Sequence, residues 1–250
     1  MLLSHQLQGA RFELKYVVGE SCARGVRDFA LSYLVPDEHS TPENNYEYPV
    51  HSLYLDSASL TLCRATLHGL KNRFKLRIRY YDDSPDSPAF LEVKRRQNDV
   101  ILKQRVAVRR GSIPRVVAGH WPVPADIIDQ SPRGMSALQE FTHLRTLLMA
   151  EGQAIVSYTR EAYVTANDNT VRLTLDRRLR GYRCNGQGCL ARSGVPVEPD
   201  VGGVILELKF TDRFPIWMRE LVRAFNLERR SVAKYVACIM SLRAPALQLV

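Results

Sequence analysis

The segment FKLRIRYY, residues 74–81, places three cations on one face of a predicted strand. Successive side chains of a strand point to opposite faces, so Lys75, Arg77 and Arg79 share one face and the apolar residues between them share the other. Like charges this close repel one another, and such a row costs stability unless something anionic lies opposite. The segment therefore predicts an anion-binding surface.

The same kind of charged face recurs along the chain. Reading the other predicted strands with a period of two collects on one face Arg11, Glu13, Lys15, Glu92, Lys94, Arg96, Lys103, Arg105, Arg160, Arg172, Asp176, Glu207 and Lys209. An ordinary solvated side of a sheet would carry a mixture of Ser, Thr, Gln, Glu and Lys. Arg and Lys dominate here instead, which favours a surface that binds a polyanion.

Phosphate groups are the anions that this set of side chains suits best. The guanidinium fork of Arg makes bidentate contacts with phosphate, and Lys supplies point charges. The carboxylates on the same face are explained if they hold a Mg²⁺ or Mn²⁺ ion that also binds the phosphates. Phosphoryl transfer depends on positioning and charge neutralisation, which such a surface could provide.

Short alternating segments must position these residues. Strands are predicted at residues 11–18, 50–57, 74–81, 89–96, 101–110, 154–164, 171–179 and 203–210, and helices at 21–35, 58–69, 135–152, 213–227 and 231–243. The short gaps between strands favour antiparallel pairing. If the strands close with their apolar face outward, helices must cover that face and the charged face lines a tunnel.

The predicted fold class is therefore α+β: an eight-stranded antiparallel β-barrel with helices packed outside. Residues 111–133 are rich in Pro and Gly and could mark a domain boundary. The strands on both sides of that segment share one charge pattern, so a single domain over residues 1–250 is the prediction.

Composition limits the classes of partner. The chain has 35 Lys and Arg against 26 Asp and Glu, a net charge of +9, which favours nucleic acid, anionic membranes or phosphorylated molecules as partners. No run approaches the roughly 20 apolar residues of a membrane helix, and no secretory leader is evident. Five scattered cysteines, an odd number, favour a reduced, cytoplasmic protein over a disulfide scaffold.

Several site types find no support in the sequence. There is no Gly-rich phosphate loop of the G-x-x-x-x-G-K-[ST] type, and the six histidines are dispersed without a nucleophile motif. RNA-binding surfaces present aromatic rings for base stacking beside the basic groups. Here Phe12, Phe74, Tyr80 and Phe210 alternate away from the basic face, so nucleic acid is not the expected ligand.

With these residues identified, the chain resembles the VTC domain, the polyphosphate polymerase branch of the triphosphate tunnel metalloenzymes (the CYTH-like superfamily). The resemblance runs from about residue 10 to about residue 242. Its motifs, in chain order, are FELKY, YLDS, KLRIR, LEVKRR, LKQRV, YTREAY, LTLD, LELKF and SVAKY. It implies an eight-stranded tunnel that binds triphosphate and a divalent cation and transfers the γ-phosphoryl group of ATP to a growing polyphosphate chain.

The resemblance also implies roles for individual residues. Phosphate contacts are expected from Lys15, Arg77, Arg79, Lys94, Lys103, Arg105, Arg160, Lys209 and Lys234. Of these, the residues expected to act in catalysis are Lys15, Arg77, Arg79, Lys94, Lys209 and Lys234. Glu207 matches the metal-ligand position, and Glu13 and Asp176 are further candidate ligands for Mn²⁺ or Mg²⁺.

One departure from the wider superfamily bears on the reaction. Arg11 stands where a Glu-x-Glu-x-Lys signature would have its first Glu, which favours the VTC branch over the simple hydrolases. Hydrolysis of a triphosphate and non-catalytic binding of polyphosphate remain alternatives, because all three use the same cationic clamp. A membrane-protein partner is possible, and the sequence does not predict the oligomeric state.

Overall fold

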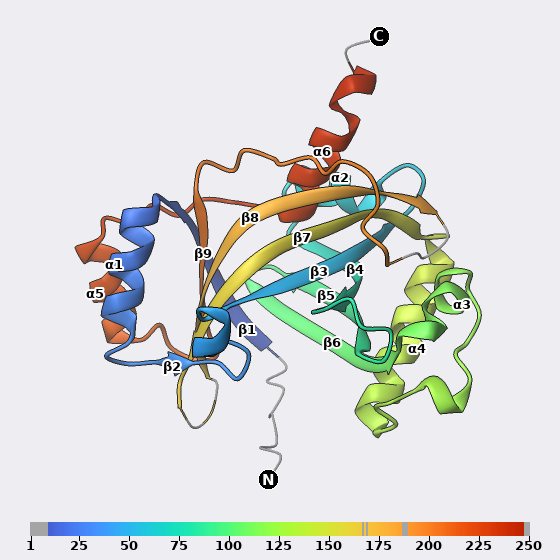
Figure 1. Cartoon of the computed structure of the whole chain (residues 1–250), viewed down its shortest axis with the longest axis horizontal. Coiled ribbons are helices and arrows are strands. Elements are labelled where there is room, and N and C mark those ends of the chain that lie inside the picture. Colours follow the sequence, from blue (N-terminus) through green and yellow to red (C-terminus); the bar gives the residue numbers. More distant parts are fainter. Residues whose placement is uncertain (1–9, 167, 169, 187–189, 248–250) are drawn as a thin grey trace.

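Eight antiparallel strands form a closed barrel at the centre of the molecule (Figure 1). The computed structural model describes residues 10–166, 168, 170–186 and 190–247. The strands are β1 (Ala10–Val18), β3 (Glu47–Asp56), β4 (Asn72–Tyr80), β5 (Pro88–Gln97), β6 (Val100–Arg109), β7 (Glu151–Val164), β8 (Val171–Gly186) and β9 (Val204–Phe210). Their order is β7-β3-β4-β5-β6-β1-β9-β8, and pairing of β8 with β7 closes the barrel. The predicted fold is confirmed.

A short strand extends the sheet beyond the predicted set. β2 (Val35–Pro36) pairs with the end of β7 at Tyr163 and Val164. Two residues are too few for an alternating pattern, so the sequence gives no signal for this strand.

Six α-helices lie in the part of the chain that the structure describes. They are α1 (Glu20–Ala30), α2 (Thr61–Leu67), α3 (Ile113–Val117), α4 (Pro132–Leu147), α5 (Ile216–Ala224) and α6 (Lys234–Leu247). The five-residue α3 was not predicted. α4 begins earlier than predicted because the Ser131 side chain accepts a hydrogen bond from the Gly134 N–H, 3.0 Å, and so caps the helix. α6 begins three residues later than the predicted start at residue 231.

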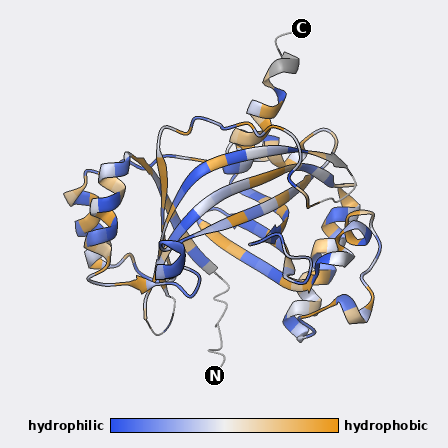
Figure 2. Ribbon diagram, viewed as in Figure 1, coloured by the Kyte–Doolittle hydropathy of each residue, from blue (hydrophilic) through white to orange (hydrophobic). Residues whose placement is uncertain are grey.

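The outer face of the barrel is apolar and covered by helices. α3 and α4 pack over β4, β5 and β6, where Leu76, Ile78 and Val106 meet Leu138 and Phe141. α1 and α5 lie at the opposite side and cover β1, β8 and β9 (Figure 1). The ribbon coloured by hydropathy shows hydrophobic and hydrophilic residues following one another along the strands (Figure 2). Since alternate side chains point to opposite faces, this packing directs the charged set inward.

One end of the barrel is closed by α6 and α2. Tyr235 of α6 stacks on Tyr54 of β3, with ring centroids 4.6 Å apart, and its hydroxyl donates to Asp56. None of the helices in the described part of the chain is both long and apolar enough to span a membrane. Cys22, Cys63 and Cys238 are free thiols, and Cys189 lies outside the described residues.

Candidate functional site

The barrel interior holds an interlocked set of charges, called here the tunnel cluster. Its cations are Lys15, Lys75, Arg77, Arg79, Lys94, Lys103, Arg105, Arg160, Lys209 and Lys234, and its carboxylates are Glu13, Glu92, Asp176 and Glu207. Cations outnumber carboxylates, and every barrel strand except β3 contributes to the cluster. The interior is therefore built to attract anions.

Glu207 is the most heavily contacted carboxylate of the cluster. The ammonium groups of Lys209, Lys234 and Lys15 lie 2.6, 3.0 and 3.2 Å from its oxygens. Burial alone would raise the pKa of Glu207, but these cations hold it well below its usual range. The residue is thus an anionic anchor shared by β1, β9 and α6.

Asp176 connects the same anchor to β7. It lies directly opposite Arg160 in the pairing of β8 with β7, and the guanidinium donates two hydrogen bonds to it, of 2.7 and 2.8 Å. Lys234 Nζ, at the first residue of α6, lies 2.7 Å from Asp176 Oδ2, the oxygen that also accepts from Arg160 Nη2. This bidentate geometry fixes the Arg160 fork toward the tunnel.

Two further carboxylates organise the remaining strands. Glu92 of β5 pairs with Arg77 of β4 and Lys103 of β6, each at 2.6 Å, and its side chain is fully buried. Glu13 of β1 pairs with Lys94 at 2.7 Å and with Lys15 at 3.1 Å. Glu92 thereby connects the neighbouring strands β4, β5 and β6, and Glu13 connects β1 to β5, which lies beyond β6.

Lys75 and Arg79 are the cations with the least compensation. Lys75 has no ion pair with any described residue and lies opposite Lys94 in the strand pairing. Burial lowers the pKa of Lys75 well below its usual range, and Lys15 and Lys94 lower it further. Among the described residues, Arg79 bonds only to the hydroxyls of Ser52 and Tyr158, each at 3.2 Å. A bound polyanion would supply the negative charge that these two side chains lack.

Burial affects even a paired lysine of the cluster. The pKa of Lys209 is lowered to about 7 by burial, although Glu207 lies 2.6 Å away and acts in the opposite direction. Additional negative charge near this ammonium would favour its protonated form.

Two aromatic residues of the tunnel, Tyr54 and Tyr158, were not among the site residues predicted from the sequence. Tyr54 lies opposite Arg77 in the strand pairing and accepts from its guanidinium at 3.3 Å. The Tyr158 ring lies 5.0 Å from Lys234 Nζ and 5.2 Å from the Arg160 guanidinium. The alternation of side chains along the strand already places Tyr158 on the same face as Arg160, but neither tyrosine carries a charge that would mark it as part of an anion site.

The structure brings together all of the residues predicted for the site. The predicted set found in the tunnel cluster is Glu13, Lys15, Arg77, Arg79, Lys94, Lys103, Arg105, Arg160, Asp176, Glu207, Lys209 and Lys234. Three members of the charged face, Arg11, Arg96 and Arg172, are not part of the tunnel cluster, and Arg11 lies near Arg172. Arg96 bonds to Asn98 and Asp99 at the β5–β6 turn, and Arg172 pairs with Asp37 and Tyr48.

The carboxylates of the cluster fit a metal that is shared with a ligand. Within the described ranges, no three His, Cys, Asp or Glu side chains converge as an all-protein cage. Glu13 and Glu207 do converge on one cation, the Lys15 ammonium, at 3.1 and 3.2 Å. Mg²⁺ in phosphate-binding sites is commonly held by one or two carboxylates together with the substrate phosphates. This donor set suits such a shared arrangement.

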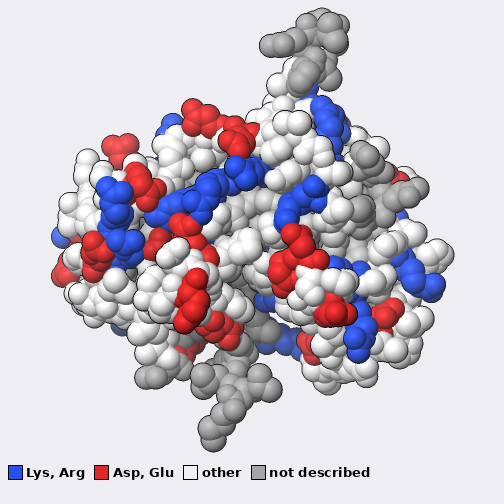
Figure 3. Space-filling model, viewed as in Figure 1, with Lys and Arg blue, Asp and Glu red and all other residues white. Residues whose placement is uncertain are grey.

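The outer surface differs from the interior in its charge balance. On the face in Figure 3, Lys and Arg gather in a band over β8 with Asp and Glu beside it. The exposed arginines of β8 are paired, Arg178 with Glu47 and Arg180 with Glu198. Uncompensated positive charge is therefore a property of the tunnel rather than of this band.

The chain matches a known protein family. The sequence profile named "VTC domain" matches residues 10–243. No curated protein matches the chain. Solved structures that match include the PH1819 protein from Pyrococcus horikoshii OT3, 13% identical, covering 94% of this chain and 98% of that one, with a TM-score of 0.45.

Two further structures match at similar levels. A candidate adenylate cyclase from Bacillus halodurans is 13% identical to this chain. The match covers 90% of this chain and 95% of the other, with a TM-score of 0.48. A candidate adenylate cyclase from Vibrio parahaemolyticus is 13% identical, with coverages of 92% and 98% and a TM-score of 0.46. The family rests on the profile match, which spans nearly the whole chain: this protein belongs to the VTC domain family.

Proposed function

We propose that this domain binds the triphosphate of ATP in its tunnel and transfers the terminal phosphoryl group to a growing polyphosphate chain. The observation that carries the proposal is the excess of cations in the tunnel, above all the half-buried Lys75 and the buried Arg79, which have no carboxylate partner among the described residues. Phosphoryl transfer needs charge neutralisation and alignment, and a ring of fixed cations supplies both.

The proposed phosphate-binding residues form two groups on different walls of the tunnel. Arg77, Arg79, Lys94 and Lys103, on three adjacent strands, would hold phosphate oxygens along one wall. Lys15, Arg160, Lys209 and Lys234 would hold them along the other, with Arg105 beside Lys103. Because each cation is anchored by a neighbour, little reorganisation is needed when the phosphates enter.

A divalent cation, Mn²⁺ or Mg²⁺, is part of the proposal. Glu207 and Glu13 would hold it, with Asp176 as a third candidate, and phosphate oxygens would complete its coordination. When bound, such an ion offsets charge on the phosphate oxygens.

Incubation of the purified protein with ATP and Mn²⁺ or Mg²⁺ tests the proposal. Polymer should appear on a gel stained for polyphosphate, and it should lengthen with time. Release of free phosphate without polymer would replace polymerisation by hydrolysis. Tight binding of tripolyphosphate without any turnover would make the domain a binding module.

Replacing Arg79 should weaken ligand binding more than it weakens the fold. In Arg79→Ala, tripolyphosphate affinity should fall by about 1.5–3 kcal/mol, the range for a hydrogen bond to a charged group. The free energy of unfolding without ligand should change less, because no carboxylate loses its partner. Calorimetry and thermal unfolding measure the two effects.

Arg96→Ala is the matched control for Arg79→Ala. Arg96 was predicted on the same charged face but bonds at the β5–β6 turn. Its removal should leave tripolyphosphate affinity unchanged. Equal losses in the two variants would contradict the assignment of Arg79 to the ligand site.

Lys75→Met should have opposite effects on stability and binding. The lowered pKa of Lys75 means that the folded protein binds this proton more weakly than the unfolded chain does. The wild type should therefore gain stability as pH rises from the folded-state pKa toward the unfolded one, and the variant should lack this gain. Without ligand at neutral pH, the variant should melt at a higher temperature, yet it should bind tripolyphosphate more weakly.

Thermal unfolding between pH 6 and 9, with and without tripolyphosphate, measures both effects. Lys71→Met is the control, since Lys71 is exposed just before β4. A lower melting temperature in ligand-free Lys75→Met than in Lys71→Met would show that the Lys75 charge is not a cost to the fold.

A further inference from the structure

The YLDS motif of β3 contributes no charge to the tunnel cluster, yet it contains a fully buried carboxylate, that of Asp56. Asp56 Oδ1 accepts hydrogen bonds from the Ser57 and Leu62 N–H groups, at 2.8 and 2.9 Å. Asp56 Oδ2 accepts from the Cys63 N–H at 2.9 Å and from the Tyr235 hydroxyl at 3.0 Å. The carboxylate therefore joins the end of β3 to the first turn of α2 and to α6.

Tyr235 is held by β3 at two points. Its hydroxyl donates to Asp56, and its ring stacks on the ring of Tyr54, with centroids 4.6 Å apart and planes inclined by 10°. Successive residues of an α-helix differ in direction by about 100°. Fixing the direction of Tyr235 therefore also fixes the direction in which the preceding residue, Lys234, leaves the helix.

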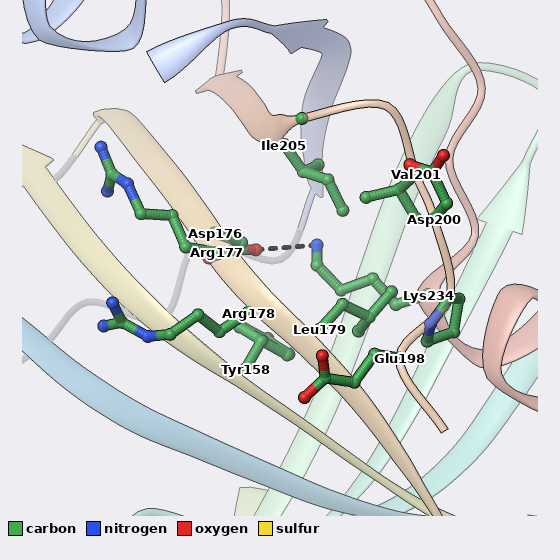
Figure 4. A pocket seen from close by; sticks show the side chains of 12 residues that line it. Tyr158, Asp176, Arg177, Arg178, Leu179, Glu198, Asp200, Val201, Ile205 and Lys234 are labelled. Carbon is green, nitrogen blue, oxygen red and sulfur yellow. Dashed lines mark ion pairs between the residues drawn. The ribbon is translucent and has the colours of Figure 1, made fainter. Parts of the chain in front are cut away.

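Lys234 points from the first turn of α6 into the tunnel cluster. Its ammonium lies 2.7 Å from Asp176, an ion pair drawn as a dashed line in Figure 4, and 3.0 Å from Glu207. The orientation of α6 thus determines whether this cation reaches the two carboxylates and the space beside them.

Packing alone does not hold the Lys234 side chain in this place. A cavity of about 280 Å³ lies beside it, lined also by Tyr158, Leu179 and Val201 (Figure 4). Free volume of this size leaves room for other rotamers of a lysine. The position of the ammonium therefore depends on how the helix backbone is turned.

The chain that leads into α6 is attached to the opposite wall. The Arg230 N–H donates to the Lys15 carbonyl at 2.9 Å, and Lys15 Nζ donates to the Val232 carbonyl at 3.3 Å. These bonds fix where the helix begins. They involve residues before the helix, so they do not fix its rotation about its own axis.

We propose that Asp56 is a positioning residue for phosphate binding in the tunnel. Through the Tyr235 hydroxyl it sets the rotation of α6 and so places the Lys234 ammonium at the phosphate site, while Asp56 itself contacts no phosphate. This inference rests on the proposed function, because it takes Lys234 to bind a phosphate of the ligand.

Tyr235→Phe removes the hydroxyl bond and keeps the stacked ring. Tripolyphosphate affinity should fall at least about fivefold, within the range for coupled residues in contact. Tyr163→Phe is the matched control, because the buried Tyr163 hydroxyl donates to Glu161 at 2.5 Å beneath α1, outside the tunnel. Both variants should melt at a lower temperature, but the control should keep its affinity within about twofold.

A double-mutant cycle tests whether the effect passes through Lys234. Lys234→Met removes the ammonium that Asp56 is proposed to position. In that background, Tyr235→Phe should lower tripolyphosphate affinity by less than about twofold further, since no ammonium remains to be misplaced. Losses that simply add in the double variant would overturn the assignment.

Asp56→Ala tests the carboxylate itself. Its tripolyphosphate affinity should match that of Tyr235→Phe within about twofold, because both variants lose the same positioning bond. Its melting temperature should be lower, because the N–H groups of Leu62 and Cys63 also lose their acceptor. A merely structural role would make affinity follow stability instead.

Chemical labelling follows the position of Lys234 without any ligand. In a brief treatment with acetic anhydride, read by mass spectrometry, the Lys234 amine of Tyr235→Phe should react at least about threefold faster than in the wild type, since a displaced amine is less stabilised as the cation. Tyr163→Phe should react at the wild-type rate.

The outcomes separate this inference from the proposed function. Unchanged labelling of Lys234 in Tyr235→Phe, or equal affinity losses in Tyr235→Phe and Tyr163→Phe, would overturn the positioning role and leave phosphate binding intact. Failure of the wild type to bind tripolyphosphate would overturn the proposed function, and the labelling rates would still decide whether Asp56 positions Lys234.

Discussion

Tripolyphosphate should bind this domain at least a hundredfold more tightly than orthophosphate. The tunnel cluster spreads its cations over successive strands, from Lys103 of β6 through Lys15 of β1 to Arg160 of β7. Each added phosphate therefore meets cations that a single phosphate cannot reach. One further charge-assisted hydrogen bond for each of two phosphates contributes about 3–6 kcal/mol, which is roughly a hundredfold or more in affinity.

Calorimetry with orthophosphate, pyrophosphate and tripolyphosphate in one buffer measures the increments directly. AMP and ATP provide the same comparison with the nucleoside held constant. Affinity should also fall as salt is added, although less steeply than for an exposed basic patch, because buried charges are less screened. Equal affinities for AMP and ATP would exclude the tunnel as the site.

The inward direction of the charged side chains was predictable because it depends only on the alternation of side chains along each strand. Leu76 and Ile78 are fully buried beneath the outer helices, so Arg77 and Arg79, their immediate neighbours, must face the interior. The same argument holds for each strand with clean alternation. Closure of the barrel followed from having eight such strands whose apolar faces all required cover.

Features that depend on pairing register were not predictable in this way. The contact between Tyr54 and Arg77 requires knowing that β3 lies beside β4 with those two residues opposite each other. The irregularity opposite Tyr158, which shifts the register of β8 by one residue, likewise leaves no mark in the alternating pattern. Arg96 lies on the same face of β5 as Lys94, but it is near the end of the strand, where contacts in the β5–β6 turn hold its side chain.

The position of Lys234 in the tunnel could not be predicted from periodicity either, for a different reason. Helical periodicity alone would not place a lysine at the start of α6 inside a barrel of strands. Its position depends on the tertiary contacts of Tyr235 with Tyr54 and Asp56, which seat the helix against the barrel end. The resemblance to the VTC domain identified this residue where physical reasoning from the sequence did not.

The cluster's carboxylates have two possible uses, and the structure makes both concrete. Each one offsets buried cations, and Glu13 and Glu207 also converge where a metal could be shared with phosphates. Glu207 and Glu92 form a matched pair for separating these uses. Lys209 pairs only with Glu207, and Lys103 pairs only with Glu92, among the described residues.

Glu207→Gln should lower metal-dependent turnover by at least about a hundredfold, as expected when a group that stabilises transferring phosphate is removed. Glu92→Gln should keep most of its turnover at saturating ATP and metal. Both variants leave cations of the tunnel without their carboxylate, Lys209 in Glu207→Gln and Lys103 and Arg77 in Glu92→Gln, so both should lose stability, by up to about 3–5 kcal/mol. Stability therefore does not distinguish the two variants, but the dependence of turnover on metal concentration does.

Glu207→Gln should need far more Mn²⁺ for half-maximal turnover, and electron paramagnetic resonance should detect less Mn²⁺ bound beside tripolyphosphate. If Glu207 acts only as a counter-ion, the two variants should titrate alike with Mn²⁺, and Glu207 leaves the list of candidate metal ligands.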